Sequence, residues 1–146
     1  MTAPDGFDTV TPYIVVKDGK GALALYEKAV GAEICGKLEM PGSDKIAHAC
    51  FQIGSSKIFL SDENDQMPAP TDGIGARFYI YVDDVDAQHK QALAAGMTEK
   101  AAPEDMFWGD RTAVLTCPYG HTWTIATHVR DVSPEDLAEA MKAMAG

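Results

Sequence analysis

The chain has 146 residues, of which 46% are hydrophobic, and carries a net charge of −10 from 12 Lys and Arg against 22 Asp and Glu. This length and apolar content predict one compact domain, or two small half-domains that share a core, and argue against intrinsic disorder. The negative charge and the lack of a basic patch disfavour nucleic acid and anionic membranes as partners, and no apolar run approaches the roughly 20 residues that span a bilayer.

A strand, a helix and a hairpin are predicted in the first half of the chain, residues 8–62. The run Tyr13 to Val16 is rich in β-branched residues, and Asp18 can cap the helix that follows it. Gly31 stands where a left-handed residue ends a helix, because glycine takes a positive φ without a Cβ clash. The helix carries one apolar stripe, formed by Ala22, Leu25, Tyr26, Ala29 and Val30.

The same pattern recurs in residues 76–130, which indicates two modules. Phe78 to Val82 is the β-rich run, Asp84 is the possible helix cap, and Gly96 closes the helix. The stripe of this second helix is Val85, His89, Ala92 and Leu93. Each half then continues into paired strands, predicted at residues 46–53 and 57–60 and at residues 112–116 and 122–127.

Two further segments complete a single domain of two modules over residues 1–146. Residues 63–75, rich in Pro, Asp and Gly, are expected to be the linker between the modules. Residues 131–146 are expected to be a C-terminal helix, since Ser133 supplies a hydroxyl cap and Pro134 occupies the first helical position. The helix stripe of Leu137, Ala140, Met141 and Met144 indicates packing against the domain or a second subunit.

Strand alternation separates the strand residues onto two faces, of which the helices cover the more apolar one. The helix-covered faces are expected to carry Ile14, Val16, Ala49, Phe51, Ile53, Ile58, Leu60, Phe78, Ile80, Val82, Trp123 and Ile125. The opposite faces are expected to carry Thr11, Tyr13, Val15, His48, Cys50, Gln52, Lys57, Phe59, Arg77, Tyr79, Tyr81, Arg111, Thr122 and Thr124. Because this second set mixes aromatic, hydroxyl and cationic groups, it indicates a curved cleft that encloses a small molecule. The alternative is that the aromatic residues pack against a partner sheet or subunit and bind nothing.

Four motifs carry a resemblance to a known family: Phe107-Trp108-Gly109-Asp110-Arg111, Pro118-Tyr119-Gly120-His121-Thr122-Trp123, Ala126-Thr127-His128 and Asp131-Val132-Ser133-Pro134-Glu135. With the duplicated module over residues 8–130, they resemble the vicinal oxygen chelate superfamily of glyoxalase I, bleomycin-resistance proteins and extradiol dioxygenases. Within it, the chain looks like the demethylubiquinone-methyltransferase-like subgroup. The resemblance implies an α+β fold in which tandem βαβββ modules form curved mixed sheets around a cleft, with the C-terminal helix added. It also implies a homodimer.

Metal-bearing relatives place four ligands on the first and last strands of the two modules, and the matching positions here are Thr11, Phe59, Arg77 and Thr124. Phe59 offers no lone pair, and the positive charge of Arg77 repels a cation. We therefore expect neither a metal ion nor another cofactor, which argues against metal-dependent glyoxalase I or dioxygenase activity. The four histidines show no metal-ligand spacing, and His48 is the best candidate for a hydrogen-bonding role in the cleft.

The expected ligand-binding residues are Thr11, Tyr13, His48, Cys50, Phe59, Arg77, Tyr79, Trp108, Arg111 and Thr124. Trp108 can stack on a planar ligand, and Arg111 with Arg77 can hold a carboxylate, phosphate or enolate oxygen. Structural roles are the alternative, in which Asp110 pairs with an arginine and Trp108 covers the mouth of a cavity. No residue is assigned a catalytic role.

Three cysteines, Cys35, Cys50 and Cys117, show no close paired spacing and indicate reduced thiols that behave as small apolar residues. Residues 1–8 show no apolar targeting segment. Together these features predict a cytoplasmic protein.

Three functions stay open at this point. The first is a metal-independent protein that binds a small aromatic or anionic molecule in the cleft. The second is a metal-independent isomerase, lyase or transferase-like enzyme, with His48 or a tyrosine as proton carrier and Arg77 or Arg111 stabilising an oxyanion. The third is a role in subunit or partner contacts through the C-terminal helix.

Overall fold

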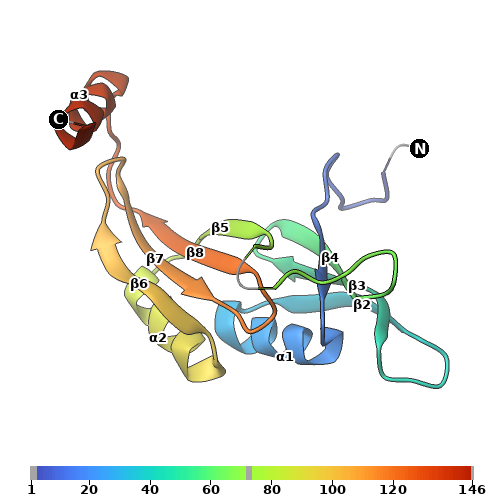
Figure 1. The fold of residues 1–146 in the computed structure, drawn as a ribbon. Helices are drawn as coiled ribbons and strands as arrows, with labels where there is room; N and C mark the ends of the chain where they lie inside the picture. Colours follow the sequence, from blue (N-terminus) through green and yellow to red (C-terminus); the bar gives the residue numbers. More distant parts are fainter. Residues whose placement is uncertain (1–2, 72–73, 146) are drawn as a thin grey trace.

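The computed structural model describes residues 3–71 and 74–145, which form two βαβββ modules and a terminal helix (Figure 1). The first module consists of β1 (Tyr13–Val16), α1 (Gly19–Val30), β2 (Glu33–Glu39), β3 (Ile46–Ile53) and β4 (Ser56–Asp62). The second consists of β5 (Arg77–Tyr81), α2 (Val85–Ala95), β6 (Thr98–Asp105), β7 (Asp110–Thr116) and β8 (Thr122–His128), and α3 (Pro134–Ala145) follows it. The expected α+β fold of tandem modules is therefore confirmed. Residues 72–73 of the expected linker and residue 146 of the expected terminal helix lie outside the described residues.

Each module builds one four-stranded mixed sheet. The strand orders are β1-β4-β3-β2 and β5-β8-β7-β6, and the two sheets do not close into a barrel. In each sheet the first and last strands of the module are parallel neighbours, and the other pairs are antiparallel. The helix between the first two strands makes this parallel pairing possible, because a parallel connection needs a crossover.

The helix ends lie where the sequence predicts them. The Asp18 carboxylate accepts a hydrogen bond from the Gly21 N–H at 3.0 Å, and Asp84 accepts one from the Ala87 N–H at 3.1 Å. Gly31 ends α1 with a φ of 72°, in the left-handed region that favours glycine. Both caps satisfy N–H groups that have no partner inside the helix.

The edge strands β2 and β6 are the ones that the hydrophobic pattern does not reveal. Every residue of β2 is exposed, and so are most residues of β6. Both strands lie at an outer edge of their sheet, so neither of their faces needs to be apolar. Because burial does not alternate along these strands, their sequences lack the two-residue hydrophobic alternation by which a strand is recognised.

One hydrophobic core joins the two modules. Tyr26 of α1 packs on Trp123 of β8 with ring centroids 4.9 Å apart, and on Phe51 of β3 at 5.4 Å. The Tyr26 hydroxyl lies 3.4 Å from the Cys117 sulfur, and burial raises the pKa of this tyrosine above its ordinary value. Helices α1 and α2 also pack against each other (Figure 1). The first helix therefore contributes to the core of both sheets.

His121 joins the modules at their boundary. Its Nδ1 accepts a hydrogen bond from the Ala76 N–H at 2.9 Å, and its Nε2–H donates to the Val15 carbonyl of β1 at 3.1 Å. This pair of bonds requires the neutral ring with its proton on Nε2. The residue is 3% exposed, and burial lowers the pKa of His121 although the bond to Val15 opposes the shift.

The terminal helix α3 stands apart from the rest of the molecule (Figure 1). It contacts no other helix or strand among the described residues, and none of its own residues is buried. The Ser133 hydroxyl caps it by accepting from the Asp136 N–H at 3.1 Å. Across residues 3–71 and 74–145, no helix combines the length and apolar character needed to cross a membrane.

The neutral state of His121 predicts a pH-dependent stability. Because the folded-state pKa lies below that of the unfolded chain, the unfolded state takes up the proton first and stability falls below about pH 6.5. His121→Leu should lose this dependence and cost about 1–2 kcal/mol at neutral pH, since it leaves two part-buried backbone groups unpaired. Urea unfolding of both proteins across a pH series measures the effect. If the free energies of unfolding of the two proteins differ by the same amount at every pH, His121 is not held neutral in the folded protein.

Candidate functional site

A cavity of about 590 Å³ lies between the two modules, beside the edge strand β5. One wall is formed by the N-terminal segment, through Asp8, Val10 and Pro12, and by the β3–β4 turn at residues 53–58. The other wall is residues 78–81 of β5. A volume of this size suits a small organic molecule. Of the residues predicted to bind a ligand, Tyr79 lines this cavity.

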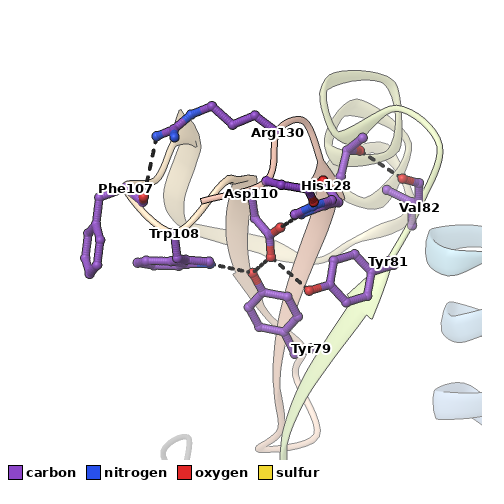
Figure 2. Close-up of polar contacts among 10 residues, drawn as sticks. Tyr79, Tyr81, Val82, Phe107, Trp108, Asp110, His128 and Arg130 are labelled. Atoms are coloured by element: carbon purple, nitrogen blue, oxygen red, sulfur yellow. Dashed lines mark hydrogen bonds and ion pairs between the residues drawn. The ribbon is translucent and has the colours of Figure 1, made fainter. Parts of the chain in front are cut away.

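Two tyrosines of the cavity wall are held by one buried carboxylate. The Tyr79 hydroxyl donates to Oδ2 of Asp110 at 2.5 Å, and the Tyr81 hydroxyl donates to the same oxygen at 3.0 Å (Figure 2). Asp110 is 3% exposed. Burial opposes its charge, yet the hydrogen bonds from Tyr79, His128 and Tyr81 hold the pKa of Asp110 below its ordinary value. Burial and the bond to Asp110 raise the pKa of Tyr79 to about 12, so both groups keep their protonation states near neutral pH.

His128 completes the ring of donors around Asp110. Its Nδ1 lies 2.8 Å from Oδ1 of Asp110, and its Nε2 lies 2.7 Å from the Asp131 carboxylate. Hydrogen bonds from the ring to Asp131 and then to Asp110 raise the pKa of His128. The protonated ring donates to both carboxylates at once, which favours the charged form.

Trp108 reaches the same cluster from the turn between β6 and β7. Its indole N–H donates to the Tyr79 hydroxyl oxygen at 3.1 Å (Figure 2). The turn depends on Gly109, whose φ is 105° and where an added Cβ would lie 2.1 Å from the Arg130 carbonyl oxygen. Only glycine fits this close approach, so Gly109 fixes the positions of Trp108 and Asp110 on either side of it.

The remaining aromatic candidates form a separate group on the first module. His48 packs against Phe59 with ring centroids 4.7 Å apart and against Tyr13 at 5.9 Å. Cys50 is the cross-strand neighbour of Phe59 and shares its face, and Thr11 lies just before β1. Within the described chain, no hydrogen bond or aromatic contact links this group to the cluster around Asp110. The structure therefore divides the predicted site residues between two faces that do not line one cavity.

The face predicted for Arg111 is wrong. Arg111 pairs with Thr127 on the face that carries Ile125 and Trp123, so it lies on the helix-covered side and not opposite it. Its guanidinium donates to Asp86 of α2 at 3.0 and 3.1 Å and to Asp105 of β6 at 3.1 Å. These carboxylates raise the pKa of Arg111, and they occupy the forked donors that a ligand oxygen would need.

Arg77 and Thr124 lie on the outer face of the second sheet as predicted. Arg77 is the cross-strand neighbour of Thr122, and Thr124 is that of Tyr79. The predicted site residues did not include Tyr81 or His128. An arginine partner for Asp110 was one alternative, and its partners in the structure are Tyr79, Tyr81 and His128. The available signal was the register of the β7–β8 hairpin, because counting outward from its turn at residues 117–121 places Asp110 opposite His128.

The family of this chain follows from comparison with known proteins. The model of the Glyoxalase/Bleomycin resistance protein/Dioxygenase superfamily matches residues 6–125. The chain belongs to this superfamily. An uncharacterized protein of Mycobacterium bovis, Mb0911c, is 35% identical over 142 residues, covering 92% of each chain. A relative in Mycobacterium tuberculosis, Rv0887c, has the same identity over 92% of this chain and 82% of its own.

Solved structures of other proteins show the same fold. TioX from Micromonospora sp. ML1 superimposes with a TM-score of 0.66 at 20% identity, covering 82% of this chain and 98% of its own. A glyoxalase/bleomycin resistance protein/dioxygenase family enzyme from Burkholderia phytofirmans gives a TM-score of 0.64 at 25% identity, covering 80% of this chain and 95% of its own. These likenesses extend over both modules and leave the chemistry of the site to the residues themselves.

The donor chemistry of the four positions matched to the superfamily's metal ligands does not fit a divalent ion. Phe59 is packed between Phe7 and His48, and Arg77 is exposed on the outer face of β5. Thr11 and Thr124 supply only neutral hydroxyls, which are weak ligands for such an ion. Within the described ranges, no three His, Cys, Asp or Glu side chains gather as a metal-binding group.

The contacts of His128 predict how it titrates. Because both partners are carboxylates, the His128 pKa should exceed the ordinary value of about 6.5, and Asp131→Asn should lower it while Asp110 remains in place. Asp136→Asn, which removes a similar exposed carboxylate from α3, is the matched control and should leave the pKa unchanged. Proton NMR titration of the imidazole signals measures all three proteins. An ordinary His128 pKa in the wild type would refute the arrangement.

Proposed function

We propose that the protein binds a small planar aromatic molecule, without a metal ion, in the cavity beside β5. The observation that carries this proposal is the pair Tyr79 and Tyr81, whose rings line the cavity while Asp110 holds their hydroxyls. The two residues are 45% and 64% exposed, which leaves part of their surface accessible to a ligand. Rings that are fixed before binding lose little conformational entropy when a ligand stacks on them.

The hydrogen bonds of the cluster favour a ligand that donates hydrogen bonds to the two tyrosine oxygens. Both phenolic protons are committed to Asp110, so the phenolic oxygens offer only their lone pairs to a ligand. Trp108 already uses one lone pair of Tyr79, which leaves Tyr81 as the freer acceptor. Aromatic compounds that carry a hydroxyl, an amide or an amino group meet these requirements.

An anionic ligand has less support than the aromatic one. The cavity is lined by one acid, Asp8, and one base, Lys57, so its nearest formal charges balance. The Lys57 ammonium also donates to the Gly6 carbonyl at 2.6 Å. Arg111, the cation expected to bind an anion, is engaged by Asp86 and Asp105 on the other side of the sheet.

A thermal-shift screen of aromatic metabolites and antibiotics tests this function. Hydroxyl- or amino-substituted planar compounds should raise the melting temperature. Tyr81→Ala should weaken binding of such a compound by about tenfold, because one stacking surface is worth about 0.5–1.5 kcal/mol and its hydrogen bond is lost as well. Titration calorimetry on the wild type and the variant gives the ratio.

The matched control is Tyr13→Ala, which removes a tyrosine of similar exposure from the face of the first module. Its affinity for the same compound should equal that of the wild type. Equal loss in both variants, or loss in Tyr13→Ala alone, would place the ligand elsewhere. So would a screen in which no aromatic compound stabilises the protein.

A second candidate function is proton transfer at the same cluster. The line from Asp131 through His128 to Asp110 favours it, because a histidine between two carboxylates is a reservoir for one proton. His48 has less support as the proton carrier, since it packs between Tyr13 and Phe59. An enzyme of this kind would lose activity in His128→Gln and keep it in His48→Ala. Turnover of the identified ligand by both variants distinguishes the two histidines.

We further propose that two copies of the chain assemble through α3. The helix has 12 residues and no tertiary contact among the described elements, and an isolated helix of this length is marginally stable in water. Met141 and Met144 are 52% and 67% exposed on its apolar stripe. A second copy offers the same stripe, so the contact can be self-complementary about a twofold axis.

Light scattering after size exclusion tests this assembly. The full chain should give twice its 15.7 kDa, and a chain that ends before Ser133 should give a monomer. Met141→Asp should also dissociate the dimer, because it places a charge within the apolar contact. Ala138→Asp, the same charge away from the stripe, is the control and should leave the dimer intact. A full-length monomer would contradict the proposal.

A further inference from the structure

Two cysteine side chains meet between the edge strand β2 and the inner strand β3 of the first sheet. The Sγ atoms of Cys35 in β2 and Cys50 in β3 lie 2.7 Å apart, as free thiols. A disulfide joins two sulfur atoms at about 2.05 Å, so these two sulfurs need to move only slightly to be joined. Fifteen positions separate the two cysteines in the sequence, and the pairing of β2 with β3 brings them together.

A bulge in β2 creates this contact. Ile34 pairs with Phe51 and Gly36 pairs with Cys50, which leaves Cys35 without a partner of its own in the ladder. Two residues of β2 therefore face one residue of β3, and the extra side chain turns towards Cys50. A Cβ added at Gly36 would meet no atom within 4 Å, so Cys35 is the residue of this bulge whose side chain contacts Cys50.

The two thiols differ in access. Cys35 is exposed, whereas Cys50 is 7% exposed. Burial and the contact with Cys35 raise the pKa of Cys50 to about 11, so its thiol stays protonated near neutral pH. An outside reagent therefore meets Cys35 first, and Cys50 lies behind it as the resolving thiol.

We propose that Cys35 and Cys50 form a site of reversible thiol–disulfide exchange with a low-molecular-weight disulfide such as oxidised glutathione. The Cys35 thiolate attacks one sulfur of glutathione disulfide, and the first glutathione thiolate leaves. The Cys50 sulfur then attacks Sγ of Cys35, its proton passes to solvent, and the second glutathione leaves. The two cysteines are oxidised by two electrons, and glutathione disulfide is reduced to two thiols.

The resulting bond would tie the exposed edge strand β2 to β3. It would also hold the Cys50 sulfur, which shares its face with Phe59 and His48, against β2. Cys35 and Cys50 lie in the first sheet, whereas Tyr79 and Asp110 lie in the second, and neither cysteine lines the ligand cavity. In the reducing cytoplasm where we expect the protein, the open dithiol would be the resting state.

Incubation of the reduced full-length chain in glutathione buffers of graded oxidised-to-reduced ratio tests the site. After quenching with N-ethylmaleimide, intact-mass analysis should show the loss of two hydrogens without a retained glutathione. Trypsin should then release residues 29–37 linked to residues 46–57, and dithiothreitol should separate them. Wild-type protein that keeps both thiols free at every ratio, or that keeps glutathione on Cys35, would overturn the proposal.

Two variants make the result specific. Cys50→Ser should trap glutathione on Cys35, because the resolving thiol is missing, and Cys35→Ser should acquire no glutathione. Cys117→Ala removes the third, buried thiol and should form the linked peptides as the wild type does. Linked peptides that include Cys117 would instead indicate unfolding and would also count against the assignment.

Discussion

The charge of Asp110 is the constraint on which the candidate site depends. A carboxylate that is 3% exposed must be matched by hydrogen-bond donors, and here they come from neighbouring strands, with Tyr79 and Tyr81 on β5 and His128 on β8. The three strands must therefore stay in register for the charge to be tolerated. The same hydrogen bonds fix the two phenol rings at the wall of the cavity, because both hydroxyl protons are donated to Asp110. The recognition that we propose for the cavity would thus follow from a buried ionised group that is not itself exposed to a ligand.

Local features of the fold were predictable because they depend on neighbouring residues alone. Asp18, Asp84 and Gly31 stand at helix ends for reasons of capping and backbone conformation that the sequence displays directly. The alternation of Ile14 and Val16, and of Trp123 and Ile125, predicted the buried faces, and all four residues are at most 3% exposed. The repeat of these features made the two modules visible. The edge strands escaped detection because they bury almost nothing.

The site was harder to predict because it depends on register between strands and on the placement of one module against the other. Arg111 follows the same alternation as Ala113 and Leu115, which assigns it to the helix side, where the N-terminal end of α2 supplies Asp86. The partnership of Asp110 with His128 needed the hairpin register, and the thiol contact of Cys35 needed a bulge that no local pattern announces. The sequence also placed all candidate residues around one cleft. The two aromatic groups instead occupy separate faces, because the modules share a core through α1 and α2 and their sheets stay open.

The most direct test of the account is a crystal structure of the protein with an aromatic compound that stabilises it. We predict electron density between β5 and the β3–β4 turn, with the ring of the compound against Tyr81 and a donor group directed at its hydroxyl oxygen. The Asp110 carboxylate should keep its bonds to both tyrosines in the complex. A compound bound to the Tyr13, His48 and Phe59 group, or a metal ion held inside the cavity, would contradict the account.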